Sequence, residues 1–147
     1  MEAKQKILFR LGTQAFANAD FSKAIEYFNR SLAIGQYNMS AKADAYYWRG
    51  EANYRLEHYA QAGNDLRRYL EFAPDKMNRE YGLALYNLGY TDFKQKNYNG
   101  ALNWFTRFVE LSMTVLYRQM LTIVSVTVTF MPAVLIRPVR IMPVLWK

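Results

Sequence analysis

The side chains that could carry out metal, acid–base or nucleophilic chemistry are few in this sequence. It contains no cysteine and a single histidine, His58, which stands just before Tyr59 in a polar stretch. A protein zinc site needs several Cys, His or carboxylate ligands together, so we interpret His58 as a surface turn residue. The absence of cysteine also excludes disulfide scaffolds and thiolate nucleophiles and leaves the redox compartment undefined.

Acidic residues could also take part in chemistry, but they do not cluster in the sequence. Those that could act as a general acid or base are Glu26, Glu51, Asp65, Glu71 and Asp92. Such a group must lie within hydrogen-bonding reach of a substrate, whereas the helical pattern described below spreads these residues along solvated surfaces. The glycines are isolated and form no phosphate-binding loop. We therefore expect no enzyme, no cofactor, no metal and no small-molecule substrate.

The net charge of +7, from 19 basic and 12 acidic residues, raises the question of nucleic-acid binding. Four of the basic residues follow Leu111, where no acidic residue occurs, so residues 1–110 carry only 15 basic against 12 acidic side chains. In that part the two signs are interleaved, which is typical of solvated helix faces. The charge pattern therefore argues against nucleic acid, and an RNA-binding helical repeat is kept as an alternative.

An internal repeat reveals the elements that must position these residues. The stretches LGTQAFANADFSKAIEYFNRSL, RGEANYRLEHYAQAGNDLRRYL and LGYTDFKQKNYNGALNWFTRFV align without a gap, at periods of 38 and then 39 residues. The aligned columns are Gly12, Gly50 and Gly89, then Phe16, Tyr54 and Phe93, then Phe21, Tyr59 and Tyr98, then Ala24, Ala62 and Ala101, then Phe28, Leu66 and Phe105. A fixed period of this length predicts stacked supersecondary units.

Each unit has the pattern of two helices joined by a short turn. Apolar residues recur at steps of three and four on both sides of the polar segments NADF, LEHY and QKNY. Glycine inside a helix costs about 1 kcal/mol relative to alanine, so it is useful only where another helix comes very close. The glycine and alanine columns therefore predict the contact line of an antiparallel helix pair.

These residues resemble the tetratricopeptide repeat family. The family pattern is matched by Leu11-Gly12, Phe16, Phe21, Ala24, Phe28 and Ser31, and again by Leu88-Gly89, Phe93, Tyr98, Ala101, Phe105 and Phe108. The middle copy ends with Pro74 but has Arg49 where leucine is usual. The resemblance implies an all-α, right-handed helical solenoid of three helix-turn-helix repeats within residues 1–110, at about 5–37, 43–76 and 82–112.

The same resemblance implies a protein-binding scaffold that takes a peptide or a partner helix on its concave face. The positions that face the groove in this family are here Lys6, Arg10, Thr13, Tyr47, Glu51, Arg55, Tyr86, Tyr90 and Lys94. Tyrosines interleaved with both charge signs suit such a partner, because they offer rigid flat contacts with polar handles. The Lys, Asn and Arg set with which some family members grip a terminal carboxylate is not formed in its usual register.

Both ends of the repeat array are expected to be uncapped. Ile7, Leu8 and Leu11 lie almost at the start and are available to a further repeat, so we expect a fragment of a longer array or self-association through these ends. The opening MEAKQKILFRLG has no uninterrupted apolar stretch and is not a secretory signal. The compartment is undefined: cytoplasmic by default, or the cell envelope if the chain belongs to a longer exported protein.

The tail at 111–147 differs sharply in composition from the repeats. A fourth glycine is due near residue 126 or 127, but Val126 and Thr127 stand there in an alternating apolar and hydroxyl pattern that favours a strand. Residues 119–136 are uncharged and just long enough to span a bilayer, which would make a tail-anchored membrane adaptor, although Pro132 and four Ser or Thr residues oppose it. The third hypothesis is a fourth repeat read in the wrong frame.

The frame hypothesis makes a direct prediction about the coding DNA. Codons that encode residues 120–132 can also encode, in a neighbouring frame, Ala-Asp-Asn-Arg-Ile-Gly-Asp-Cys-Tyr-Phe-Tyr-Ala, which resembles a first helix of the repeat. We expect sequencing from the codon of Phe108 past that of Lys147, with translation in all three frames, to show further repeats. Stop codons throughout that frame would contradict the hypothesis and leave the membrane segment as the one to pursue.

Overall fold

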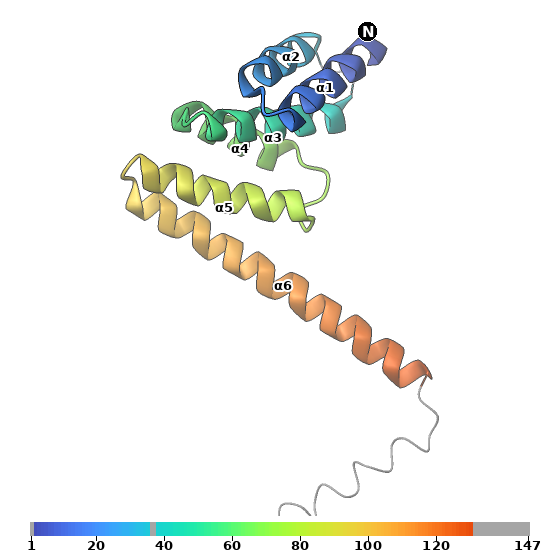
Figure 1. The fold of residues 1–147 in the computed structure, drawn as a ribbon. Helices are drawn as coiled ribbons and strands as arrows, with labels where there is room; N and C mark the ends of the chain where they lie inside the picture. Colours follow the sequence, from blue (N-terminus) through green and yellow to red (C-terminus); the bar gives the residue numbers. More distant parts are fainter. Residues whose placement is uncertain (1, 36–37, 131–147) are drawn as a thin grey trace, which may run out of the picture. The chain divides into compact units, whose positions relative to one another are not determined.

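A computed structural model describes residues 2–35 and 38–130 of the chain, with side chains of the last helix up to residue 125. Its six helices are α1 (Glu2–Ala17), α2 (Phe21–Ala33), α3 (Met39–Arg55), α4 (Tyr59–Phe72), α5 (Arg79–Lys94) and α6 (Tyr98–Phe130). They pack as three antiparallel pairs, α1–α2, α3–α4 and α5–α6 (Figure 1). These are the first, middle and third pairs below. The chain divides after Leu111 into two compact units, and the first contains α1 to α5 and the beginning of α6. The expected all-α fold is confirmed.

The turn inside each pair has the same backbone geometry. Ala19, Glu57 and Lys96 all have a left-handed φ, of 59°, 62° and 62°. In each turn the left-handed residue donates to a carbonyl three residues back, and the next residue to one five residues back, at 2.8 to 3.0 Å. This pair of bonds is a Schellman motif, which satisfies the last carbonyls of the first helix and reverses the chain.

The residue after each of these turns begins the second helix of the pair. Asp20 accepts a hydrogen bond from the backbone of Lys23, and Asn97 accepts one from Gly100, both at 3.2 Å. His58 holds the same place in the middle pair but makes no side-chain capping bond with the described backbone. Its ring nitrogen lies 3.4 Å from the side-chain oxygen of Asn53. His58 is thus an exposed turn residue, as expected.

The aligned glycines mark a close approach of the two helices within each pair, which confirms the predicted contact line. A Cβ added at Gly12 would lie 2.6 Å from the ring of Phe28, and one at Gly89 would lie 2.5 Å from Phe105. At Gly50 the nearest atom, from Leu66, is 3.0 Å away. A side chain at these positions would force the two helices apart.

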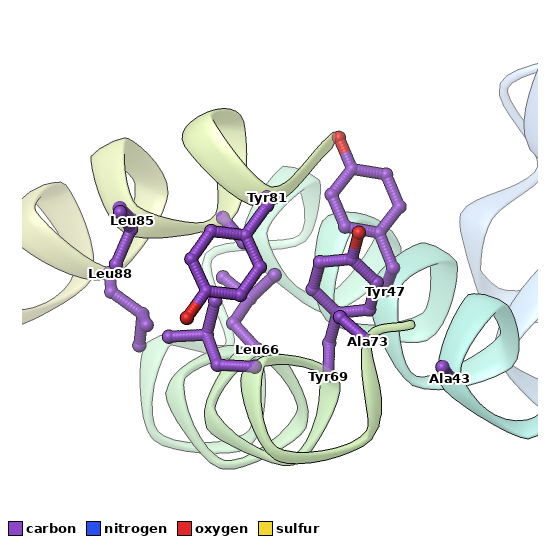
Figure 2. Packing of buried hydrophobic residues seen from close by; sticks show 10 residues of the cluster. Ala43, Tyr47, Leu66, Tyr69, Ala73, Tyr81, Leu85 and Leu88 are labelled. Atoms are coloured by element: carbon purple, nitrogen blue, oxygen red, sulfur yellow. The ribbon is translucent and has the colours of Figure 1, made fainter. Parts of the chain in front are cut away.

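The main core lies where the middle pair meets α5. Figure 2 shows Tyr47 of α3, Leu66 and Tyr69 of α4 and Tyr81 of α5 gathered between the three helices. The rings of Tyr47 and Tyr69 are 5.1 Å apart, and those of Tyr69 and Tyr81 are 6.4 Å apart. A smaller cluster joins the first pair to α3. Each junction therefore buries apolar surface that one pair alone would leave exposed.

The unusual Arg49 is held by a buried carboxylate. It donates two hydrogen bonds to Asp65 of α4, at 2.6 and 2.9 Å, and a third to Asn29 of α2, at 2.8 Å. Asn53 of α3 also donates to Asp65, at 3.3 Å. Two parallel hydrogen bonds between an arginine and a carboxylate form a strong ion pair. Through its further bond to Asn29, Arg49 also links the first pair to the middle pair, whereas a leucine here could make only apolar contacts.

A matching bond in the third pair runs in the opposite direction. Trp104 stands at the aligned position of Asp65, and Asp92 at that of Asn53. The Trp104 ring nitrogen donates to Asp92 at 3.0 Å. The donor is therefore on the first helix in the middle pair and on the second helix in the third pair.

The strand expected around Val126 and Thr127 is wrong, because these residues belong to α6, which runs from Tyr98 to Phe130. Neither Gly nor Pro interrupts the chain between Gly100 and Pro132. A helix already begun gains one backbone hydrogen bond for each added residue, so the alternating pattern does not end it. Within the described helices, none is both long enough and apolar enough to cross a membrane; residues 131–136 of the candidate span lie outside the described part.

The glycine contacts predict opposite effects of alanine at two glycines of α5. Gly89→Ala should lower the free energy of unfolding by about 1–3 kcal/mol, because its Cβ would overlap the Phe105 ring. Gly82→Ala should raise it by about 0.5–1 kcal/mol, since its nearest neighbour is 3.8 Å away and the unfolded chain loses freedom. Urea unfolding measures both, and similar changes in the two variants would contradict the contact line.

Candidate functional site

The first helices of the three pairs lie on the inner side of the array. In the part of the chain that the structure describes, α1 contacts α3 and α3 contacts α5, whereas the second helices α2 and α4 do not touch. The first helices are therefore closer together than the second helices, as on the inside of a curve. The surface along α1, α3 and α5 is called the inner face below.

A polar bridge joins α3 to α5 on the inner face. The side-chain nitrogen of Asn87 donates to the carboxylate of Glu51, which is only 8% exposed. Burial raises the pKa of Glu51, while the bond from Asn87 and the charge of Arg55 act in the opposite direction. Glu51 is thus a buried acceptor fixed in place by a partner on the next helix.

Tyrosines surround this bridge. Burial raises the pKa of Tyr54, and the nearby Tyr59, Tyr90 and Glu51 add to the rise. The rings of Tyr86 and Tyr90 are 5.0 Å apart, and a hydrogen bond with Tyr90 raises the pKa of Tyr86. We call Glu51, Tyr54, Asn87 and Tyr90 the seam; Tyr86 lies beside it.

The two ends of the seam differ in charge: one carries both signs and the other is basic. Where α3 and α5 begin, burial and the charge of Glu80 raise the pKa of Asp44. Where the two helices end, Arg55 and Lys94 are exposed. Arg79, the first residue of α5, lies beside Glu80, so the inner face carries both charge signs where the helices begin and is basic where they end.

Of the residues predicted on α1, Lys6 and Arg10 are exposed and Thr13 is half-buried, but the structure does not join them to the seam. Lys6 forms an ion pair with Glu2 of the same helix, at 3.0 Å. Thr13 donates its hydroxyl to the backbone oxygen of Arg10, at 2.9 Å. These side chains therefore form a separate, mostly basic part of the inner face.

Tyr47 was expected in the groove, but it lies in the core. Its side chain is 5% exposed and packs against Tyr69 and Trp48. Burial raises its pKa, and Glu51 adds to the rise. Helix α5 packs over Tyr47, so this side chain cannot contact a partner. Tyr86, which stands at the aligned position of the third pair, is 37% exposed.

Sequence reasoning missed two members of the seam, Tyr54 and Asn87. Tyr54 was assigned to helix packing, and it does contact Tyr59, with ring centres 5.8 Å apart. Asn87 was not among the positions expected to face the groove. Its position next to Tyr86 and one helical turn before Tyr90 could have indicated that it lies on this surface.

The remaining polar clusters lie between helices. Among residues 2–35 and 38–130, no three His, Cys, Asp or Glu side chains are placed to share a metal ion. A cavity of about 310 Å³ lies against α2, α3 and α4, where its polar lining includes Arg49, Asn53 and Asp65. Those side chains are already engaged with one another in the bonds that join the helices.

Comparison with known proteins agrees with this architecture. Residues 43–76 match the family model of the tetratricopeptide repeat. The chain is also similar in structure to the N-terminal domain of stress-induced protein-1 (STI-1) from C. elegans, with a TM-score of 0.61 and 19% sequence identity. That match covers 76% of this chain and 91% of the other. No curated protein sequence matches the chain.

The burial of Glu51 predicts how stability depends on pH. Its folded-state pKa lies above the ordinary value of 4.5, so the folded state holds the proton more readily, and stability falls as pH rises through that window. Glu51→Gln removes the charge and keeps an oxygen for Asn87. We expect its melting temperature to exceed that of the wild type at neutral pH.

The difference in melting temperature between Glu51→Gln and the wild type should shrink as the pH approaches 4.5, where the wild-type carboxyl is protonated in the folded state. The control is Glu71→Gln, at a carboxylate of α4 that is 59% exposed, for which we expect no comparable gain. A melting-temperature difference for Glu51→Gln that is absent, or that does not change with pH, would contradict this account of the bridge.

Proposed function

Because the chain contains a tetratricopeptide repeat and folds into three such helix pairs, we propose that it is a non-catalytic scaffold that binds a protein partner on its inner face. Domains of this family generally mediate interactions between proteins. In this proposal the binding function belongs to residues 1–110, with repeats at about 5–37, 43–76 and 82–112. The partner supplies an extended peptide or a helix.

The observation that supports the proposal is the seam. Tyr54 and Tyr90 are half-buried, so their rings are held by neighbours while part of each surface is open. Tyrosine gives a large contact area at a small cost in conformational entropy, and it is enriched among the residues that dominate binding energy. The bond to the buried Glu51 holds the half-buried Asn87 in place before a partner arrives.

The charges give the proposed partner a direction. Asp44 and Glu80 lie at one end of the seam, and Arg55 and Lys94 at the other. A segment with acidic residues at one end meets complementary charge at Arg55 and Lys94 in one orientation, and the mixed charges of Asp44, Arg79 and Glu80 in the reverse one. Such complementarity contributes mainly to orientation and to the rate of association.

The test uses peptides selected from a random library displayed on phage, panned against the full chain. The affinity of a selected peptide is then measured by fluorescence anisotropy. Tyr90→Ala should weaken binding about tenfold, which corresponds to about 1.4 kcal/mol for one central aromatic contact. The affinity of a selected peptide that carries acidic residues should also fall as salt is added, because these residues meet Arg55 and Lys94.

The matched control is Tyr27→Ala. Tyr27 is also a half-buried tyrosine, but it lies on α2, a second helix outside the inner face. We expect this variant to bind as the wild type does. Equal losses in the two variants, or no loss in Tyr90→Ala, would show that the peptide does not bind at the seam.

A further inference from the structure

The third pair carries an apolar surface that is covered in the middle pair. Its exposed side chains are Tyr86 and Phe93 of α5 and Leu102 and Val109 of α6, at 37%, 49%, 67% and 56%. We call these four residues the end face. All four lie in the first compact unit, which extends to Leu111. Apolar side chains that gather on one surface in this way mark a contact site.

The middle pair shows what covers such a surface. The residues aligned with the end face are Tyr47, Tyr54, Gly63 and Leu70, of which Tyr47 is 5% and Leu70 8% exposed. Helix α5 packs against Tyr47 and Leu70 with Tyr81, Ala84, Leu85 and Leu88, none more than 8% exposed, whereas Tyr54 stays half-buried. The cover is therefore the first helix of a following repeat.

Helix α1 of the same chain has apolar residues at three of the four aligned positions, with Lys4 in the place of Tyr81. Ala84, Leu85 and Leu88 correspond to Ile7, Leu8 and Leu11. Leu8 is buried by its own pair, whereas Ile7 is 51% exposed and Leu11 half-buried. One copy thus has at α1 the apolar helix that the end face of another copy lacks.

An aromatic contact between the first and middle pairs predicts a second contact in the junction between copies. There the ring of Phe16 meets Trp48 of the next first helix, with ring centres 5.1 Å apart. Phe93 is aligned with Phe16, and Arg10 with Trp48. In a junction between copies, the Arg10 guanidinium would therefore meet the Phe93 ring, which is a favourable cation–π pair.

We infer that the chain associates head to tail with a second copy of itself, with α1 of one copy packed on the end face of the other. The inference is independent of the peptide-binding proposal, because it rests on the junctions between pairs. The two surfaces differ, so the contact is heterologous, and each added copy presents a new end face. The product is an open row whose mean mass rises with concentration.

The experiment measures the mass of the full chain by sedimentation velocity over a range of concentrations. Wild type should grow beyond a dimer. Ile7→Lys removes the α1 surface and Phe93→Lys removes the end face, placing a charge opposite Arg10, so each variant alone should be monomeric. An equimolar mixture should form one-to-one dimers that grow no further, because each variant keeps the one surface that the other lacks.

Two further variants serve as a replacement and as a control. Leu102→Lys, at an end-face position that is 67% exposed, replaces Phe93→Lys should the latter lose its fold by circular dichroism. Met39→Lys changes an apolar residue of similar exposure, 44%, at the start of the middle pair's first helix, and it should associate as wild type does. A monomeric wild type, single variants that still associate, or a mixture that stays monomeric would each overturn the inference.

Discussion

The close approach of two helices at an unsubstituted backbone position is the constraint on which the rest of this structure depends. At Gly12 and Gly89 a phenylalanine ring of the second helix occupies the space of the missing side chain, and Leu66 does so at Gly50. This contact fixes the spacing of the helices in each pair. The Schellman turn then has a fixed geometry, which explains why it recurs at Ala19, Glu57 and Lys96 although none of them is glycine.

Stacking of the pairs produces the inner face. The first helices approach one another, so polar side chains on α3 and α5 are partly removed from water. Burying a carboxylate is unfavourable unless it is hydrogen-bonded, and Asn87 provides that bond for Glu51. The seam is thus a by-product of the curvature: the same approach that buries Tyr47 also fixes a polar group beside exposed tyrosines.

The sequence was sufficient to predict the pairs but not the surfaces between them. Gly12, Gly50 and Gly89 and their aromatic partners lie within one repeat, where helical spacing alone determines which side chains meet. Tyr47 was misplaced because its environment depends on Tyr69 and Tyr81, which belong to the next helices along the chain. The Glu51–Asn87 bond joins residues 36 positions apart, so no local pattern could reveal it.

The reversed hydrogen bonds of the middle and third pairs have a consequence for how such an array can evolve. Asn53 donates to Asp65 in one pair, whereas Trp104 donates to Asp92 in the other. If α4 were copied into the place of α6, Asp65 would face Asp92, and two buried carboxylates would repel each other. These second helices are therefore not exchangeable modules, and duplication or shuffling of repeats in this chain would have to carry both helices of a pair together.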